Sequence, residues 1–118
     1  MKTENPIQIK SYQFALRVIK LYKYLIEEKK EFVLSKQVLR SGTSIGANVE
    51  EAIGGQSKAD FIAKLQIALK ESRETHYWVR LLIDSNYLDI KLGKSVLNDC
   101  EELLKLLSSI LKSSKSKK

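Results

Sequence analysis

Apolar residues recur at intervals of three and four along almost the whole chain, which is the spacing of one face of an α-helix. Four such patterns follow one another, over about residues 12–28, 34–53, 57–84 and 96–111. The first includes Phe14, Val18 and Ile19. Alternating strand patterns of useful length do not compete with them. Because neighbouring helices joined by short connections run antiparallel, the sequence predicts an all-α, antiparallel up-down-up-down four-helix bundle.

Capping residues stand near the ends of these patterns. Ser11 is placed to cap the first helix, and the Gly54–Gly55 pair predicts a left-handed stop for the second. Ser57 followed three residues later by Asp60 is a weak capping box for the third helix. Residues 85–93 contain Asn, Asp and Gly and predict a connection before the fourth helix.

A length of 118 residues fits one domain, which we take to span 1–118 with a flexible segment 1–9 and a flexible basic tail 112–118. The single cysteine excludes an internal disulfide framework and fits a reducing compartment. The polar N-terminal segment does not resemble a signal peptide, and no run approaches the ~20 apolar residues of a membrane span. We therefore expect a cytoplasmic protein with no membrane partner.

The net charge of +7 is unevenly distributed. Residues 1–30 and residues 91–118 each carry seven basic and three acidic side chains, whereas residues 31–90 carry seven basic and eight acidic ones. A polyanion would therefore meet the outer helices and the tail. The alternative is that these lysine-rich faces serve only solubility.

Gly42 and Gly46 lie one turn apart inside the second predicted helix, where each glycine costs about 1 kcal/mol relative to alanine. Together they would form a flat strip against which another helix can pack closely. A phosphate-binding loop is the competing interpretation. It is disfavoured, because no strand precedes the glycines and no Gly-Lys-Ser/Thr follows them.

Polar residues flank this strip on one helix face, and a second polar set on the third helix could face them. The first set is Arg40, Ser44, Asn48 and Glu51; the second is either Lys70, Glu74 and Tyr77 or Glu71, Glu74 and Trp78. Such sets form either an inter-helix network or a site. The network is the more usual outcome.

Few residues here suit catalysis. One histidine and one cysteine cannot complete a zinc site, and His76 has arginine three residues before it where a ferritin-like centre needs glutamate. Cys100 falls on the apolar stripe of the fourth helix and is interpreted as a core residue. An enzyme site around Arg40, Asn48, Glu71 and Glu74 would lack a nucleophile or cofactor cradle. We expect no enzymatic activity and no cofactor or metal.

Three segments together resemble a known family. They are Leu39–Ala52, Gln56–Phe61 and Lys70–Trp78. The chain is similar, from about Phe14 to Lys115, to the bacterial four-helix-bundle family associated with intervening sequences of large-subunit ribosomal RNA genes. It departs conservatively from the family pattern at Val38 and Val49.

This resemblance implies a ring-shaped homopentamer without established enzymatic activity. A related branch is similar to the accessory variability determinant of diversity-generating retroelements, a basic pentameric barrel that binds nucleic acid and a reverse transcriptase. The surplus of small, aromatic and polar positions in helices two and three also favours a homo-oligomer.

We therefore hypothesise that a homo-oligomer binds the backbone of RNA or DNA without reading bases. The residues assigned to this contact are Lys10, Arg17, Lys20, Lys112, Lys115, Lys117 and Lys118. The alternative is a module that docks a partner protein, such as a reverse transcriptase, through the polar face of the second and third helices and the aromatic side chains of Tyr77, Trp78 and Tyr87.

Overall fold

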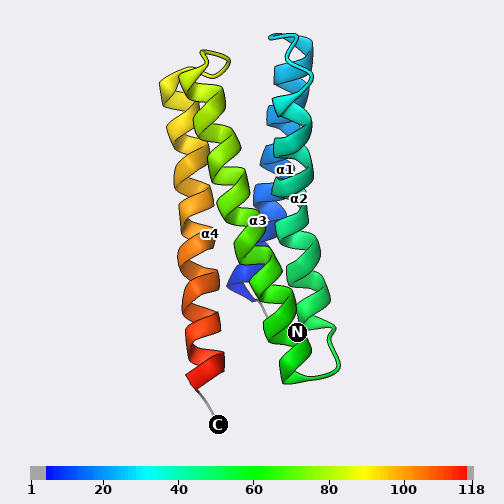
Figure 1. The fold of residues 1–118 in the computed structure, drawn as a ribbon. Coiled ribbons are helices and arrows are strands. Elements are labelled where there is room, and N and C mark those ends of the chain that lie inside the picture. The colour runs from blue at the N-terminus through cyan, green and yellow to red at the C-terminus, as the bar shows by residue number, and fades with distance from the viewer. Residues whose placement is uncertain (1–4, 117–118) are drawn as a thin grey trace.

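The computed structural model describes residues 5–116, and the chain forms four helices in that range (Figure 1). The helices are α1 (Pro6–Glu27), α2 (Leu34–Ile53), α3 (Lys58–Asp84) and α4 (Ile90–Ser116). Successive helices run antiparallel, which confirms the predicted up-down-up-down bundle, and the described residues contain no strand. The bundle is elongated, with extents of 48 × 24 × 22 Å.

The core contains one apolar stripe from each helix, with spacings of three and four. Its fully buried side chains include Val18 and Leu25 of α1, Ile45 of α2 and Leu107 of α4. Ile19, predicted to lie in the core, is 36% exposed, while Leu21 and Ile7 are buried. The stripe of α1 that faces the bundle is therefore rotated from the predicted one.

Helix α1 begins earlier than the periodicity predicted. Asn5 caps it, since its Oδ1 accepts a hydrogen bond from the backbone N–H of Ile7 at 3.2 Å, and Pro6 occupies the first turn, where its missing N–H costs nothing. Ser11, the predicted cap, is buried inside the helix and donates to the carbonyl of Gln8. Residues 6–9 are thus helical rather than flexible, and residues 1–4 lie outside the described range.

The end of α2 differs from the prediction, whereas the start of α3 agrees with it. Gly54 ends α2 with φ −85°, so the predicted left-handed stop is wrong; the positive φ angles belong to Lys30 and Asn86. The turn is instead closed by the N–H of Gly54 donating to the carbonyl of Glu50. At α3, Ser57 Oγ accepts from the N–H of Asp60 at 3.0 Å, which confirms Ser57 as the cap.

Helix α4 extends beyond its predicted bounds at both ends. It begins at Ile90, where Asp89 Oδ1 accepts from the N–H of Leu92 at 2.8 Å, so residues 90–93 are not part of the connection. It continues to Ser116, which places Lys112 and Lys115 on a helix rather than in a flexible tail. Lys117 and Lys118 lie outside the described residues.

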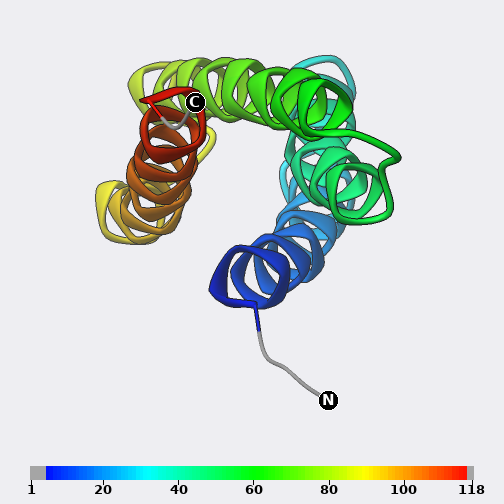
Figure 2. The ribbon, with the colours of Figure 1, turned by 90° about the horizontal axis from the view of Figure 1, so that it is seen from below.

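Seen end-on, the helices form an open arc whose two ends are α1 and α4 (Figure 2). Helix α2 packs between α1 and α3, and α3 packs against α4, whereas α1 and α4 share the least extensive contact of the four. Helices α1 and α2 approach each other closely, since a Cβ on Gly42 would lie 2.7 Å from Cγ2 of Val18. A Cβ on Gly46 would lie 3.3 Å from the carbonyl oxygen of Ser11.

Candidate functional site

A polar cluster joins the middle of α2 to α3. The guanidinium of Arg40 donates to Glu71 Oε1 at 3.3 Å and to Glu74 Oε2, and it also donates to Gln37 within its own helix. Trp78 Nε1 donates to the same Glu74 oxygen at 2.9 Å. Of the two alternatives for α3, the structure brings together Arg40 with Glu71, Glu74 and Trp78. Both carboxylates share one guanidinium, so the arrangement is an ion-pair clamp between two helices.

The other residues of the predicted polar face do not join this cluster. Asn48 donates to the carbonyl and hydroxyl oxygens of Ser44, one turn earlier in α2. Glu51 pairs with Lys64 of α3 at 2.9 Å, and this hydrogen bond and charge raise the pKa of Lys64. Residues on one helix face therefore find three separate sets of partners: Arg40 and Glu51 contact α3, whereas Asn48 bonds within α2.

Tyr77 and Trp78 meet edge to face beside the clamp, with ring centroids 5.1 Å apart. The guanidinium of Arg80 lies over the Tyr77 ring at 5.8 Å. Arg80 Nε also donates to His76 Nδ1, so the other ring nitrogen of His76 carries the proton and donates to Glu101 Oε2 at 2.9 Å. His76 thus links α3 to α4.

Two buried polar contacts escaped the sequence analysis. Thr75 Oγ1 donates to Ser41 Oγ at 2.8 Å between α2 and α3, where both side chains are inaccessible to solvent. Glu31 is also buried, and its carboxylate accepts from the backbone N–H groups of Val33, Leu34 and Ser35 at 2.6–3.2 Å. Because it precedes α2 by three residues, a capping search confined to Ser, Thr, Asp and Asn misses it.

The basic residues assigned to α1 face α4 and are largely paired there. Lys10 Nζ lies 2.9 Å from Glu102 Oε2, and Arg17 lies 2.6 Å from Asp99 Oδ2 and also donates to Ser95. Lys20 has no ion-pair partner among residues 5–116. The predicted stripe therefore forms the seam between the two outer helices, and two of its three charges are balanced by acids.

The face of α1 that points away from the core is apolar and exposed. Ile9, Tyr12, Leu16 and Ile19 follow one another at spacings of three, four and three, which places them on one stripe. Tyr12 is 63% and Leu16 is 49% exposed. Helix α1 thus has apolar residues on two opposite faces, although the bundle buries only one of them.

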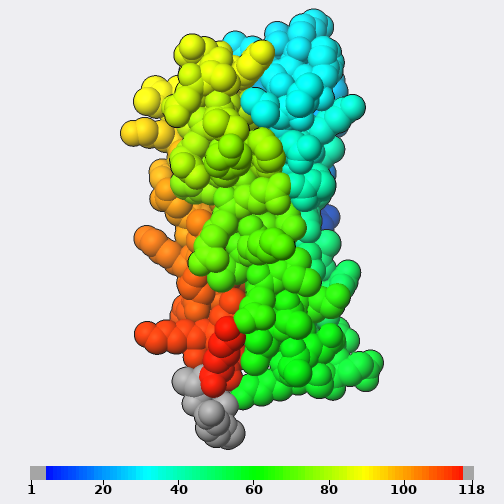
Figure 3. Space-filling model, viewed as in Figure 1, coloured from blue at the N-terminus to red at the C-terminus, as the bar shows by residue number. Residues whose placement is uncertain are grey.

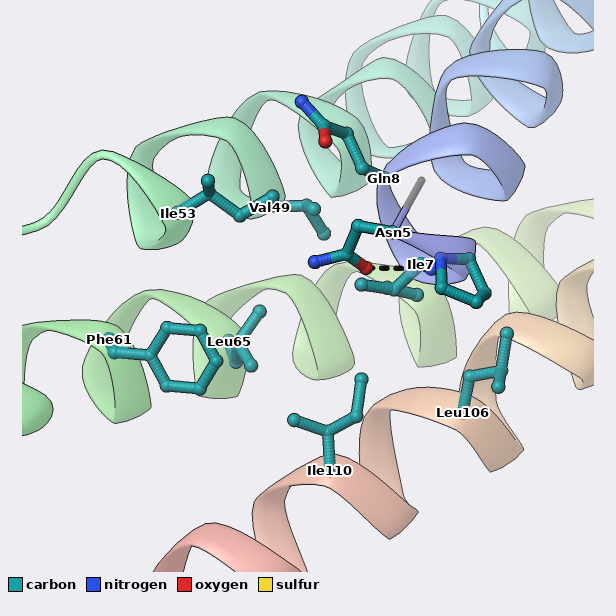
Figure 4. Close-up of a pocket in the computed structure, with 10 residues that line it drawn as sticks. Asn5, Ile7, Gln8, Val49, Ile53, Phe61, Leu65, Leu106 and Ile110 are labelled. Atoms are coloured by element: carbon teal, nitrogen blue, oxygen red, sulfur yellow. Dashed lines mark hydrogen bonds between the residues drawn. The ribbon is translucent and has the colours of Figure 1, made fainter. Parts of the chain in front are cut away.

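An apolar cavity of about 700 Å³ opens where α1 and α4 diverge. Figure 4 shows that it lies among the beginning of α1, the end of α2, the first turns of α3 and the last turns of α4. Ile53, Phe61 and Ile110 are part of its wall, and Asn5 and Gln8 are its polar lining. None of its lining residues is an acid, a base or a nucleophile.

The thiol of Cys100, the one cysteine of the chain, is buried rather than available for reaction. It donates to the carbonyl of Ser72 at 3.2 Å. Burial, assisted by the charges of Glu101 and Asp99, raises the pKa of its thiol to about 12. Within residues 5–116, no three His, Cys, Asp or Glu side chains gather as a metal site requires. No helix in that range is long and apolar enough to cross a membrane.

These features define a four-helix bundle with paired inter-helix polar contacts and an unpartnered outer face. The chain belongs to the 23S rRNA-intervening sequence protein family, which residues 3–109 match. A similar solved structure is a protein of unknown function of the S23 ribosomal protein family from Bacteroides thetaiotaomicron VPI-5482. It is 56% identical with a TM-score of 0.90, over 92% of this chain and 96% of that one. No curated protein matches.

Proposed function

We propose that the protein is a non-enzymatic homo-oligomer whose subunits pack through the outer face of α1, and that the assembly binds the backbone of RNA or DNA. The exposed stripe of Ile9, Tyr12, Leu16 and Ile19 is the observation that carries the assembly. A helix with apolar residues on opposite faces exposes a continuous apolar surface to water unless a second layer covers it.

A second copy is the occupant that this stripe suits best. Spacings of three and four match the knobs-into-holes packing of helix pairs, so a symmetric or ring-forming contact can use the same stripe in every copy. A closed ring of five is the assembly that the family resemblance implies. Such a ring would repeat each subunit's net charge of +7 around its axis and strengthen the attraction for a polyanion. The reducing interior of a cell suits the free thiol of Cys100, so cytoplasmic placement is part of the proposal.

Light scattering on Leu16→Glu tests the assembly. A glutamate in the middle of the stripe should convert the oligomer to monomer while circular dichroism stays helical, because Leu16 lies outside the core. Ile90→Glu is the matched control, since Ile90 is 62% exposed at the start of α4 and off the stripe. A monomeric wild-type protein at micromolar concentration, or an unchanged mass for Leu16→Glu, would overturn the assignment of α1.

Fluorescence anisotropy with labelled RNA tests the second half of the proposal. Affinity should fall steeply as salt rises, because backbone contacts release condensed counterions. Absence of binding at low salt, or affinity indifferent to salt, would refute it.

A partner protein is the second candidate function, and the aromatic surface on α3 favours it. Tyr77 is 46% exposed with Arg80 stacked on it, and tyrosine and arginine are enriched at protein interfaces. Capture of one defined protein that persists after nuclease treatment and is lost in Tyr77→Ala would support this candidate. Capture that nuclease abolishes would support nucleic acid instead.

A further inference from the structure

The outer surface between α3 and α4 contains a groove of about 430 Å³ that is lined by basic side chains. Arg73 comes from α3, and Lys112 and Lys115 come from the last turns of α4. Gln66 and Ser108 supply neutral polar groups, and none of the lining residues is acidic. Figure 3 shows the face on which α4 borders α3 along this side of the bundle.

The charges of this groove are not neutralised by the protein itself. Arg73, Lys112 and Lys115 are exposed and make no ion pair with residues 5–116. Lys10 and Arg17, at the α1–α4 seam, are held by carboxylates at 2.9 and 2.6 Å. A bound anion would have to displace Glu102 or Asp99 at the seam, whereas in the groove it meets cations that only water and counterions balance.

The helical register of α4 extends this basic surface in a line. Lys105, Ser108, Lys112 and Lys115 follow spacings of three, four and three, so they share one face. The seven helical steps from Ser108 to Lys115 cover about 10.5 Å. A linear polyanion with regularly spaced charges can therefore contact several of these groups at once, and the Ser108 hydroxyl and the Gln66 amide can donate to its oxygens.

We infer that the α3–α4 groove is the phosphodiester-binding surface of this protein, with Arg73, Lys112 and Lys115 as its principal contacts. The inference rests on the proposed function; of the predicted contacts it keeps Lys112 and Lys115, and it replaces the α1 residues by Arg73. Arg73, which lies in a segment of balanced charge, becomes a central residue. The groove contacts backbone, so RNA and DNA of one sequence should both bind.

Two triple variants with equal loss of charge test this assignment. The groove variant combines Arg73→Gln, Lys112→Gln and Lys115→Gln. The control combines Lys23→Gln, Lys36→Gln and Lys91→Gln, which are exposed lysines without ion pairs among the described residues and lie toward the other end of the bundle. Light scattering and circular dichroism establish that both retain the wild-type mass and helicity.

Anisotropy titrations with single-stranded RNA and with DNA of the same sequence give the readout. The groove variant should bind both at least ~10-fold more weakly, and its slope of log affinity against log salt should shrink by about 2, since each lost contact removes about 0.7 for a single strand. The control should stay within ~3-fold of wild type, the size of a purely long-range effect. Equal weakening by both variants, a groove variant that binds like wild type, or a loss confined to RNA or to DNA would overturn the groove. A wild-type protein that binds neither strand at low salt would instead overturn the proposed function.

Discussion

Helix α1 packs against its two neighbours in opposite ways. Against α2, the glycines at positions 42 and 46 bring the helices so close that a Cβ on Gly42 would overlap Val18, and one on Gly46 would lie a tight 3.3 Å from the carbonyl oxygen of Ser11. Against α4, the ion pairs Lys10–Glu102 and Arg17–Asp99 cross the contact, and farther along the two helices separate around the apolar cavity. The size of the residues at a seam thus sets the distance between the helices.

This contrast determines which surfaces are left for function. The closed side of the bundle, through α2 and α3, is joined by buried contacts such as Thr75–Ser41 and by the Arg40 clamp. The seam at the open side uses its basic residues to hold two helices together. Unpaired cations remain on the outer face of α3 and α4, and unpaired apolar residues remain on the outer face of α1.

The largest effect should come from placing a side chain in the close contact between α1 and α2. Gly42→Val should lower the free energy of unfolding by about 3 kcal/mol, because the new side chain overlaps the stiff, fully buried side chain of Val18. Adding Val18→Ala should recover a substantial part by making room. Urea unfolding measures both. Gly54→Val is the control, costing less than about 1 kcal/mol, because a Cβ on Gly54 would meet only the carbonyl oxygen of Glu50, at an ordinary contact distance of 3.6 Å. Equal losses at both glycines would contradict the close approach.

A smaller loss should follow removal of the cap that begins α2. Glu31→Ala should cost about 2 kcal/mol in urea unfolding, since three backbone N–H groups lose their acceptor, one of them buried. Glu31→Gln should recover part of it by keeping one carbonyl oxygen. Glu28→Ala, an exposed glutamate without a polar side-chain partner in residues 5–116, should change little. If the Glu28 and Glu31 variants behave alike, the cap does not hold α2.

The ion pair Arg17–Asp99 between α1 and α4 should contribute little to stability. A double-mutant cycle with Arg17→Gln and Asp99→Asn should give a coupling below about 1 kcal/mol, because both side chains are partly exposed and screened. The pair Lys36→Gln and Asp99→Asn, which are not in contact, should give none. A coupling above about 2 kcal/mol between Arg17 and Asp99 would show that the two sides of α1 are held equally firmly.

The smallest effect at neutral pH should be seen at Cys100, between α3 and α4. Its native thiol should resist a thiol reagent until urea unfolds the protein. The raised pKa means that the folded state holds this proton more tightly than the unfolded chain, where the thiol titrates near 9.0. The stabilising contribution is therefore complete below about pH 9 and is lost as pH rises toward 12. Stability of wild type relative to Cys100→Ala should fall in that window; a constant difference would contradict the shift.

Local patterns in the sequence were sufficient for the architecture. The apolar periodicity predicted four helices, and the short connections between them predicted their antiparallel order, because helices joined by short loops pack as antiparallel neighbours. Ser57 was recognised as a cap because its partner, the N–H of Asp60, is three residues away. The starts of α1 and α4 were predicted too late in the chain, because Asn5 and Asp89 cap longer helices than the apolar stripes alone required.

Burial and charge pairing depend on residues that are far apart in the sequence, so local patterns could not predict them. Apolar residues surround so much of α1 that periodicity could not decide whether Ile19 or Leu21 enters the core. Lys10 and Arg17 looked like free cations until the fold placed Glu102 and Asp99 beside them, about eighty to ninety residues later in the chain. Arg73, in a segment of balanced charge, became part of a basic groove only because α4 brings Lys112 and Lys115 next to it. The sequence by itself determined the helices, since helices form through contacts within a few residues; the tertiary structure decided which charges remain unpaired, since pairing depends on which helices become neighbours.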